Sequence, residues 1–220
     1  MKHLLLILTL IAVVSGCKKT EPDFEAIDLG YDYFPTKNGW FVDYEVDSIS
    51  HNITVDTTHF FLREKMTEDF IDEEGQVAWT LERYKKSQLQ DTFVLTDVWV
   101  QKRTTTSAEK IEENQRFIKL VFPVEENDTW NGNAYNAMDP WNYRYTNVGD
   151  PYEIDFFDFQ NTLTVSQRNN INLVDQEVAY EVYADGIGLI YKSLKDLEYQ
   201  NFEVTGVEIE MKAIGYGTLE

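Results

Sequence analysis

From Trp40 to near the C-terminus, hydrophobic and polar residues alternate along the chain, as expected for strands with one face buried. In "WFVDYEVDSI" the apolar residues occupy every second position from Trp40 to Val46, and in "VTGVEIEMKAI" from Val207 to Ala213. Further runs that favour strands are THFFLREK, VAWTLERYK, TFVLTDVWVQK, RFIKLVF, TLTVSQR and EVAYEVYA.

This pattern predicts an all-β fold with little helix. Parallel sheets need long crossover helices, which the pattern lacks, so we expect a single antiparallel meander of about ten strands. A flat open sheet would expose its edges, so the meander should form a barrel, a half-barrel or a sandwich. The segment "SAEKIEEN" (107–114) fits either a short helix or a charged hairpin loop.

The clearest turn signal is Asp185-Gly186 in "AYEVYADGIGLIYKS". This dipeptide readily takes the positive φ angles of a two-residue type I′ turn. A turn of that length predicts a tight hairpin with Tyr183 opposite Gly188 and Val182 opposite Leu189.

The N-terminus resembles an export signal. Met1-Lys2-His3 is followed by an apolar run from Leu4 to Val14, interrupted only by Thr9, which is typical of a signal-peptide core. A bilayer span needs roughly 18–20 apolar residues, so the run is too short to remain as a transmembrane helix. The following residues, Val14-Ser15-Gly16-Cys17, resemble the lipobox of bacterial lipoproteins.

The lipobox resemblance implies that Cys17 is acylated, with palmitate among its chains, and becomes the first residue of the mature protein. An ordinary cleaved signal with a leftover thiol is the alternative. We therefore divide the chain into a signal peptide (1–16), a lipid-anchored tether (17–30) and one β domain (31–220). An aspartate directly after the acylated cysteine resembles an inner-membrane retention signal. Lys18 occupies that position here, so we expect an outer-membrane anchor, on either the periplasmic or the surface side.

Two internal segments, "YDYFPTKNGWFVDYEVDSI" and "YADGIGLIYKS", resemble uncharacterised β-rich lipoproteins of Gram-negative bacteria. The resemblance implies a lipid-anchored envelope domain of unassigned role, and neither segment contains a catalytic group.

Charge narrows the possible partners. The chain has a formal net charge of −20, and without Lys2 the 18 basic and 39 acidic residues give −21. Such a surface repels nucleic-acid phosphates and anionic headgroups, so we expect no nucleic-acid partner and membrane attachment through the lipid alone. Cys17 is the single cysteine, which excludes an intramolecular disulfide.

The segment "TWNGNAYNAMDPWNYRY" (129–145) is the best candidate for ligand or partner binding. Aromatic faces and amides suit a sugar ring, and tryptophan, tyrosine and arginine concentrate at protein contacts. A long loop that packs its own aromatics over an open barrel end is the structural alternative. The candidate binding residues are Trp130, Asn131, Asn133, Tyr135, Trp141, Tyr143 and Tyr145.

Other chemistry has little support. His51 and His59 would lie about 27 Å apart along one strand, and a hairpin at Asn52 to Asp56 would be needed to join them at a metal. Neither Gly75 nor Gly132 fits position six of an EF-hand loop. We expect no metal, no cofactor and no catalytic residue, because no nucleophile elbow or nucleotide-binding loop occurs. Asp47-Ser48-Ile49 and Asp56-Thr57-Thr58 resemble O-glycosylation tripeptides of some cell envelopes.

The sequence thus predicts a non-enzymatic, lipid-anchored envelope protein. Its β domain would bind an apolar or sugar-like ligand. The alternatives are a structural or partner-docking subunit of an envelope complex and, with less support, a hydrolase with a pair of carboxylates.

Overall fold

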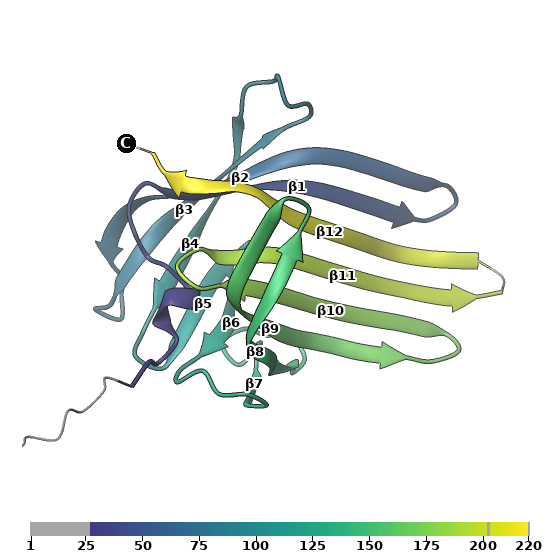
Figure 1. Cartoon of the computed structure of the whole chain (residues 1–220). Coiled ribbons are helices and arrows are strands. Elements are labelled where there is room, and N and C mark those ends of the chain that lie inside the picture. The colour runs from purple at the N-terminus through teal and green to yellow at the C-terminus, as the bar shows by residue number, and fades with distance from the viewer. Residues whose placement is uncertain (1–26, 202, 220) are drawn as a thin grey trace, which may run out of the picture.

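The computed structural model describes residues 27–201 and 203–219 and consists almost wholly of antiparallel strands (Figure 1). The predicted all-β meander is confirmed, with twelve strands. A 3-10 helix, η2 (Tyr31–Tyr33), precedes them. The strands are β1 (Trp40–His51), β2 (Val55–Ile71), β3 (Val77–Lys86), β4 (Val94–Arg103), β5 (Ser107–Glu112), β6 (Gln115–Val121), β7 (Thr129–Asn131), β8 (Asn142–Ile154), β9 (Phe157–Ile171), β10 (Asp175–Ala184), β11 (Gly188–Gln200) and β12 (Glu203–Thr218).

All twelve strands belong to one sheet, in the order β6-β5-β4-β3-β2-β1-β12-β11-β10-β9-β8-β7. The chain runs outward from β1 to β6 and inward from β7 to β12, so its first and last strands pair at the centre. The two edge strands, β6 and β7, follow one another in sequence. Curling of the sheet brings them together, which makes a nearly closed barrel.

The seam between β6 and β7 is held by a few hydrogen bonds rather than by a ladder. The amide of Ile118 donates to the carbonyl of Gly132 at 2.9 Å, and the Trp130 indole donates to the carbonyl of Ile118 at 3.0 Å. The hydroxyl of Tyr145 accepts from the Val121 amide at 2.8 Å and donates to the Val121 carbonyl at 2.7 Å. Side chains therefore satisfy much of an edge that would otherwise stay open.

The hydrophobic core has two parts. One fills the barrel near the seam, where residues of η2, β5, β6 and β8–β10 meet. The other lies where the β8–β9 hairpin crosses the sheet (Figure 1), with the rings of Tyr152 and Tyr191 5.7 Å apart and those of Phe157 and Tyr216 6.1 Å apart. The hairpin bends where Asn147 and Gly149 take positive φ angles and the β8–β9 register shifts.

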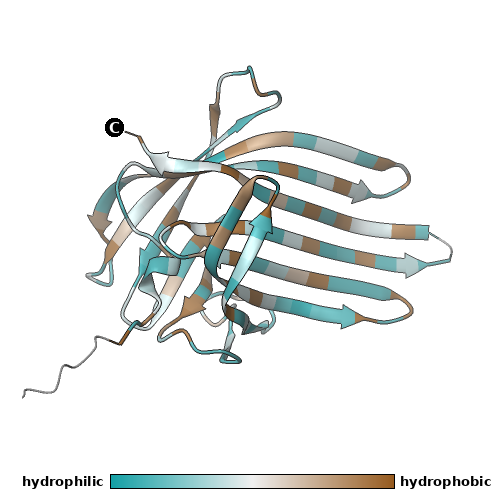
Figure 2. Ribbon diagram, viewed as in Figure 1, coloured by the Kyte–Doolittle hydropathy of each residue, from teal (hydrophilic) through white to brown (hydrophobic). Residues whose placement is uncertain are grey.

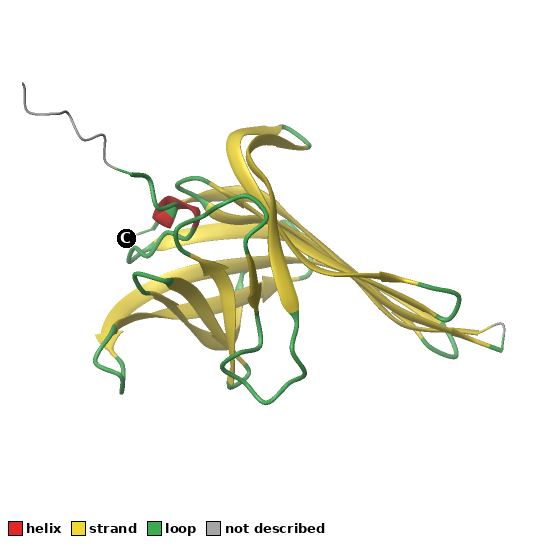
Figure 3. Cartoon of the chain, turned by 90° about the horizontal axis from the view of Figure 1, so that it is seen from below, coloured by secondary structure: helices red, strands yellow, loops and turns green. Residues whose placement is uncertain are grey.

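Beyond the barrel, β1, β2 and β9–β12 continue as a single layer (Figures 1 and 3). We call this part the distal sheet; it comprises residues 47–51, 55–60, 167–171, 175–180, 193–200 and 203–210. By register, Ser48, Thr58, Leu194 and Ile209 share one face, while Asp47, His59, Ser193 and Glu210 share the other. All eight are exposed or half-buried, and this part of the sheet runs as a single layer (Figure 3). Ala179 and Leu197 are nevertheless buried among neighbouring side chains, and Ile209 packs against the core at the inner end of the layer.

The hairpin predicted at Asp185-Gly186 is confirmed, but the register predicted for it is wrong. β10 and β11 do form a hairpin, but the loop has three residues, Asp185 to Ile187, and Tyr183 lies opposite Leu189. The extra residue is accommodated because Gly188 takes a φ of 98° and Pro35 packs where its side chain would be. The amide of Gly186 also donates to the Asp32 carbonyl at 2.9 Å, which ties the loop to η2.

Residues 107–114 were predicted to form either a short helix or a charged hairpin loop. They form a hairpin, which joins β5 to β6. Glu113 and Asn114 form its turn with positive φ angles of 49° and 63°. Many carboxylates in this segment therefore belong to a strand rather than to a helix.

The predicted tether ends on the barrel. The amide of Val124 donates to the Leu29 carbonyl at 3.1 Å, so residues just before η2 already contact the domain. The predicted signal peptide and Cys17 lie outside the described residues. Within the described ranges, no helix has the length and apolar character needed to cross a bilayer.

A substitution at Gly132 tests the packing of side chains at the seam between β6 and β7. A Cβ at this position would run into the ring of Tyr143, which is buried, so Gly132→Ala should lower the free energy of unfolding by about 1–3 kcal/mol. Gly215→Ala in β12 is the control, because its nearest neighbouring atom would be 4.0 Å away. Urea denaturation measures both; equal losses would contradict the seam packing.

Candidate functional site

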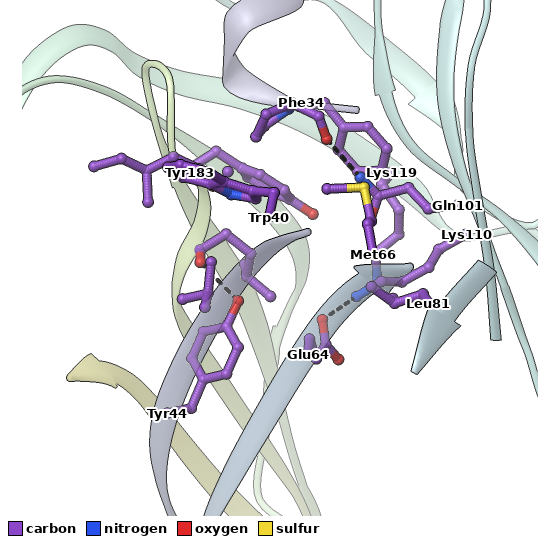
Figure 4. A pocket seen from close by; sticks show the side chains of 15 residues that line it. Phe34, Trp40, Tyr44, Glu64, Met66, Leu81, Gln101, Lys110, Lys119 and Tyr183 are labelled. Atoms are coloured by element: carbon purple, nitrogen blue, oxygen red, sulfur yellow. Dashed lines mark hydrogen bonds and ion pairs between the residues drawn. The ribbon is translucent and has the colours of Figure 1, made fainter. Parts of the chain in front are cut away.

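The barrel encloses one well-defined cavity between its wall and the loops at one end (Figure 4). Phe34, directly after η2, and Ile187 of the β10–β11 loop lie at its rim, and strands β1 to β6 supply most of its wall. The side chains labelled in Figure 4 are Phe34, Trp40, Tyr44, Glu64, Met66, Leu81, Gln101, Lys110, Lys119 and Tyr183.

Polar ends of the lining side chains fasten the loops that cover this cavity. The hydroxyl of Tyr44 donates to the Leu189 carbonyl at 2.9 Å, and the Trp40 indole donates to the Ile187 carbonyl at 3.1 Å. The amide of Gln101 donates to the Pro35 carbonyl at 2.9 Å. These donors are occupied by the protein itself.

The free volume of the cavity is small. It measures about 40 Å³, which holds a few water molecules. Sites for small organic ligands usually measure about 300–1,000 Å³. A sugar ring or an apolar ligand of that size therefore does not fit the interior in this conformation.

The wall of the cavity contains a buried ion-pair network that spans the barrel. Glu181 of β10 is 1% exposed, and its carboxylate lies 2.9 Å from the Lys119 ammonium of β6 and 3.6 Å from that of Lys192. The Tyr183 hydroxyl donates to the same carboxylate at 2.7 Å. Lys119 also lies 3.5 Å from Glu112. β6 and β10 are not neighbours in the sheet, so this pair forms only when the barrel closes.

A second ion pair links β2 to β5 and β3. The carboxylate of Glu64 lies 2.7 Å from the Lys110 ammonium and 3.1 Å from the Arg83 guanidinium. Arg83 also stacks on Trp99, with its guanidinium carbon 3.7 Å from the ring centroid. Each charge at this point is neutralised within the wall.

These contacts fix the protonation states. Burial raises the pKa of Glu181, but the ammonium groups of Lys119 and Lys192 outweigh it and lower that pKa from 4.5 to about 2. Burial opposes the charge of Lys119, and Glu181 and Glu112 nevertheless raise its pKa. Burial also raises the pKa values of the Tyr44 and Tyr183 hydroxyls. The network thus consists of permanent charges and protonated tyrosines at neutral pH.

This arrangement bears on the hydrolase alternative. A glycosidase needs two carboxylates that face the same cleft, one of them protonated or free to take a proton. Glu64 lines the cavity, whereas Glu181 does not, and both carboxylates are held in ion pairs. The interior chemistry therefore stabilises the barrel rather than presenting an acid and a base.

The predicted aromatic segment lies at the seam. Tyr143 and Tyr145 are buried in the core, and Trp130 packs against Tyr145 with the ring centroids 4.5 Å apart. The side-chain oxygen of Asn131 accepts from the amides of Asn133 and Trp141, both at 3.0 Å. These residues close the wall of the barrel at the seam, as parts of β7, β8 and the connection between them, and do not form a long loop over an open barrel end.

Of the seven predicted binding residues, Tyr135 is exposed and Trp130, Asn131 and Trp141 are half-buried. Tyr135 is 54% exposed, and the Arg116 guanidinium lies 4.5 Å from its ring centroid. Trp141 is half-buried, with the Arg168 guanidinium 3.7 Å from its ring centroid. Asn133 is buried, and its amide donates to the Asp139 carbonyl at 2.7 Å. The structure thus divides the seven residues between the seam and the surface.

The two histidines lie apart. The predicted β1–β2 hairpin is present, but its register places His59 opposite Asp47, and His51 bonds instead to Glu208 at 2.9 Å. Among the residues that the structure describes, no three His, Cys, Asp or Glu side chains are grouped to hold a metal. In the two tripeptides that resemble O-glycosylation sites, the Ser48 side chain is half-buried and the Thr57 and Thr58 side chains are exposed.

The sequence analysis missed the buried charges. Glu64 alternates with Leu62 and Met66, and Glu181 alternates with Ala179 and Tyr183; all four neighbours are buried. A charge in phase with apolar positions on a strand was therefore the available signal. Lys102, 2% exposed and paired with Asp72 at 2.8 Å and Glu74 at 2.6 Å, is a third example.

Comparisons with known proteins show a likeness at the level of structure. No protein-family model matches the chain, and no curated protein matches it. One similar solved structure is that of a protein with a YMCC-like fold, inferred to be exported, from Bacteroides fragilis NCTC 9343. It shares 8% sequence identity with a TM-score of 0.43, covering 84% of this chain and 98% of that one.

The contribution of the Lys119–Glu181 ion pair can be tested through the pH dependence of the free energy of unfolding. Because the pKa of Glu181 is lowered to about 2, its contribution is complete above about pH 4.5 and is lost as pH falls towards 2. Glu181→Gln should lower the free energy of unfolding by about 3 kcal/mol at pH 7 and flatten its decline between pH 4.5 and 2.

The control is the double variant Lys119→Met/Glu181→Gln. Removing both partners should lower the free energy of unfolding by at least about 1 kcal/mol less than the sum of the single variants. Additive losses, measured by urea denaturation, would show that the two side chains do not interact.

Proposed function

We propose that this protein is a lipid-anchored, non-enzymatic docking subunit of the bacterial cell envelope. Its barrel is a rigid body, and its distal sheet is the part that meets a protein partner. The observation that carries this proposal is the distal sheet, in which six strands extend beyond the barrel as a single layer and many side chains on both faces are exposed or half-buried.

A single layer of this kind favours a binding role. Sheets normally bury at least one face, because burial of apolar side chains offsets the entropy lost on ordering the strands. In the distal sheet Leu194 and Ile209 pair across β11 and β12 and are only half-buried, although Ile209 already packs against the edge of the core. A partner that covers them would add the burial that the isolated chain lacks.

The interior supports the same choice. The cavity has a free volume of only about 40 Å³, the loops beside it are hydrogen-bonded to the wall, and the charges around it are paired. The segment 129–145 holds the seam through Trp130 and Tyr145, so much of its aromatic surface is already used. A docking role therefore has more support than the capture of an apolar or sugar-like ligand inside the barrel.

The anchor is proposed from the sequence. The apolar run Leu4 to Val14 and the lipobox-like Val14-Ser15-Gly16-Cys17 support export and acylation of Cys17, and Lys18 supports sorting to the outer membrane. Several acyl chains on one residue hold a protein at a membrane durably, since each buried methylene contributes about 0.8 kcal/mol.

Acylation is tested by metabolic labelling in the native host. The wild-type chain should incorporate labelled palmitate and remain with the outer-membrane fraction, whereas Cys17→Ser should lose the label and leave that fraction. Retained label in the variant would contradict the anchor.

Docking is tested on the full chain in its own membrane. After mild detergent extraction, we expect it to migrate on a native gel well above the 25.7 kDa of the chain and its detergent micelle. Glu181→Gln serves as the control, because it changes the interior of the barrel and leaves the distal sheet unaltered; it should keep the complex as long as it remains folded. Migration as a monomer, both with and without prior chemical cross-linking, would contradict docking.

A further inference from the structure

The distal sheet ends in three neighbouring hairpin turns, and the β1–β2 and β9–β10 turns carry exposed apolar side chains. The turns follow β1, β9 and β11 and lie side by side at the end of the molecule farthest from the barrel (Figure 1). Ile53 is 99% exposed and Leu173 is 97% exposed. Figure 2 shows the hydrophobic colour at the tips of the β1–β2 and β9–β10 hairpins.

We define the tip surface as Ile53, Val55, Ile171, Leu173 and Val174 together with the carboxylates of Asp175 and Glu198. All five apolar residues are more than half exposed. With six strands about 4.8 Å apart, the row of tips is about 25 Å wide. Because a single layer is about 10 Å thick, the row of tips offers about 250 Å², and a partner must also cover the adjoining faces of the sheet to reach the roughly 800 Å² per partner of an ordinary interface.

The two carboxylates indicate the charge of the partner. Asp175 and Glu198 lie directly opposite each other on β10 and β11, and like charges in that position destabilise a sheet. Among the described residues, neither takes part in an ion pair with a cation. The hairpin segments 51–56, 169–175 and 198–204 contain no Lys or Arg.

A neighbouring pair shows how the protein resolves the same conflict elsewhere. Glu177 and Asp196, one step inward on the same face, are also opposite each other. There the Arg168 guanidinium lies between them, 2.6 Å from Glu177 and 4.0 Å from Asp196. The pair at the tip has the same geometry without the cation.

We infer that the tip surface binds a protein partner through a segment in which apolar residues are flanked by arginine or lysine. The apolar residues of that segment cover Leu173 and its neighbours, and a cationic side chain bridges Asp175 and Glu198 as Arg168 bridges the adjacent pair. This inference rests on the proposed docking function and names its surface and the chemistry of its partner.

Two other occupants fit the observations less well. A second copy of this chain would place carboxylates against carboxylates. An anionic bilayer would meet the same repulsion. The described chain also begins at the barrel end, at Ile27, while the tips lie at the opposite end, turned away from the anchored terminus (Figure 1).

The test is site-specific photocrosslinking in the native host, with benzoylphenylalanine at Ile171 in the otherwise intact chain. We expect a discrete adduct with one envelope protein, cross-linked at a segment with apolar residues beside Arg or Lys. Benzoylphenylalanine at Phe156, which is fully exposed at the β8–β9 turn, is the matched control and should give no such adduct.

Two variants separate recognition from stability. Ile53→Ser/Leu173→Ser should reduce the adduct at least about tenfold, the factor typical of losing interface anchor residues, with little change in melting temperature. Glu198→Arg should place a cation beside Asp175, raise the melting temperature by about 1–3 °C, and also reduce the adduct about tenfold.

Several results would overturn the inference: a phospholipid adduct, an adduct at twice the mass of the chain, no adduct, or an adduct unaffected by both variants. If one of these occurs while the native-gel complex persists, docking stands and the tip surface is not its site. If the complex itself is absent, the proposed function fails as well.

Discussion

The buried ion pair between Lys119 and Glu181 is the interaction on which the barrel depends. Neither charge tolerates burial alone, because removing a charged group from water costs several kcal/mol unless a partner lies close. Their strands, β6 and β10, are not neighbours in the sheet, so the 2.9 Å contact requires the sheet to curl until β6 meets β7. Burial of these charges and closure of the barrel are thus one event.

Closure leaves the interior occupied. Glu64 and Lys110 pair across the wall, the rings of Tyr44 and Trp40 fasten the covering loops, and the free volume falls to about 40 Å³. The barrel is a packed body rather than a container. We propose that recognition takes place outside the barrel, on the distal sheet, whose outer ends carry Ile53 and Leu173.

Local pattern predicted the strands well. The alternation from Trp40 to Val46 placed the buried positions of β1 correctly, because a strand with one buried face has a period of two. The Asp185-Gly186 turn was located but given one residue too few, since the packing of Pro35 against Gly188 depends on contacts distant in sequence. Short strands such as β7 carry too few residues to show a period.

The long-range features were not accessible to the same reasoning. The aromatic segment 129–145 was recognised as unusual, but the bond from the Trp130 indole to Ile118 appears only after β6 and β7 meet. The burial of Glu181 becomes evident only with its partner Lys119 in place, because a charge that alternates with Ala179 and Tyr183 needs a counter-charge from a distant strand to be buried. The outer ends of β2 and β9 have no buried face, so alternation gave no sign that these strands continue.

The central claim is that recognition takes place on the distal sheet and not inside the barrel. Amide hydrogen exchange, compared between the isolated chain and its detergent-extracted complex, tests this directly. The account predicts slower exchange in the complex for residues 169–175 and 198–204, with unchanged exchange at the cavity rim, residues 31–35 and 187–189. Protection gained at the rim and absent from the hairpin tips would contradict it.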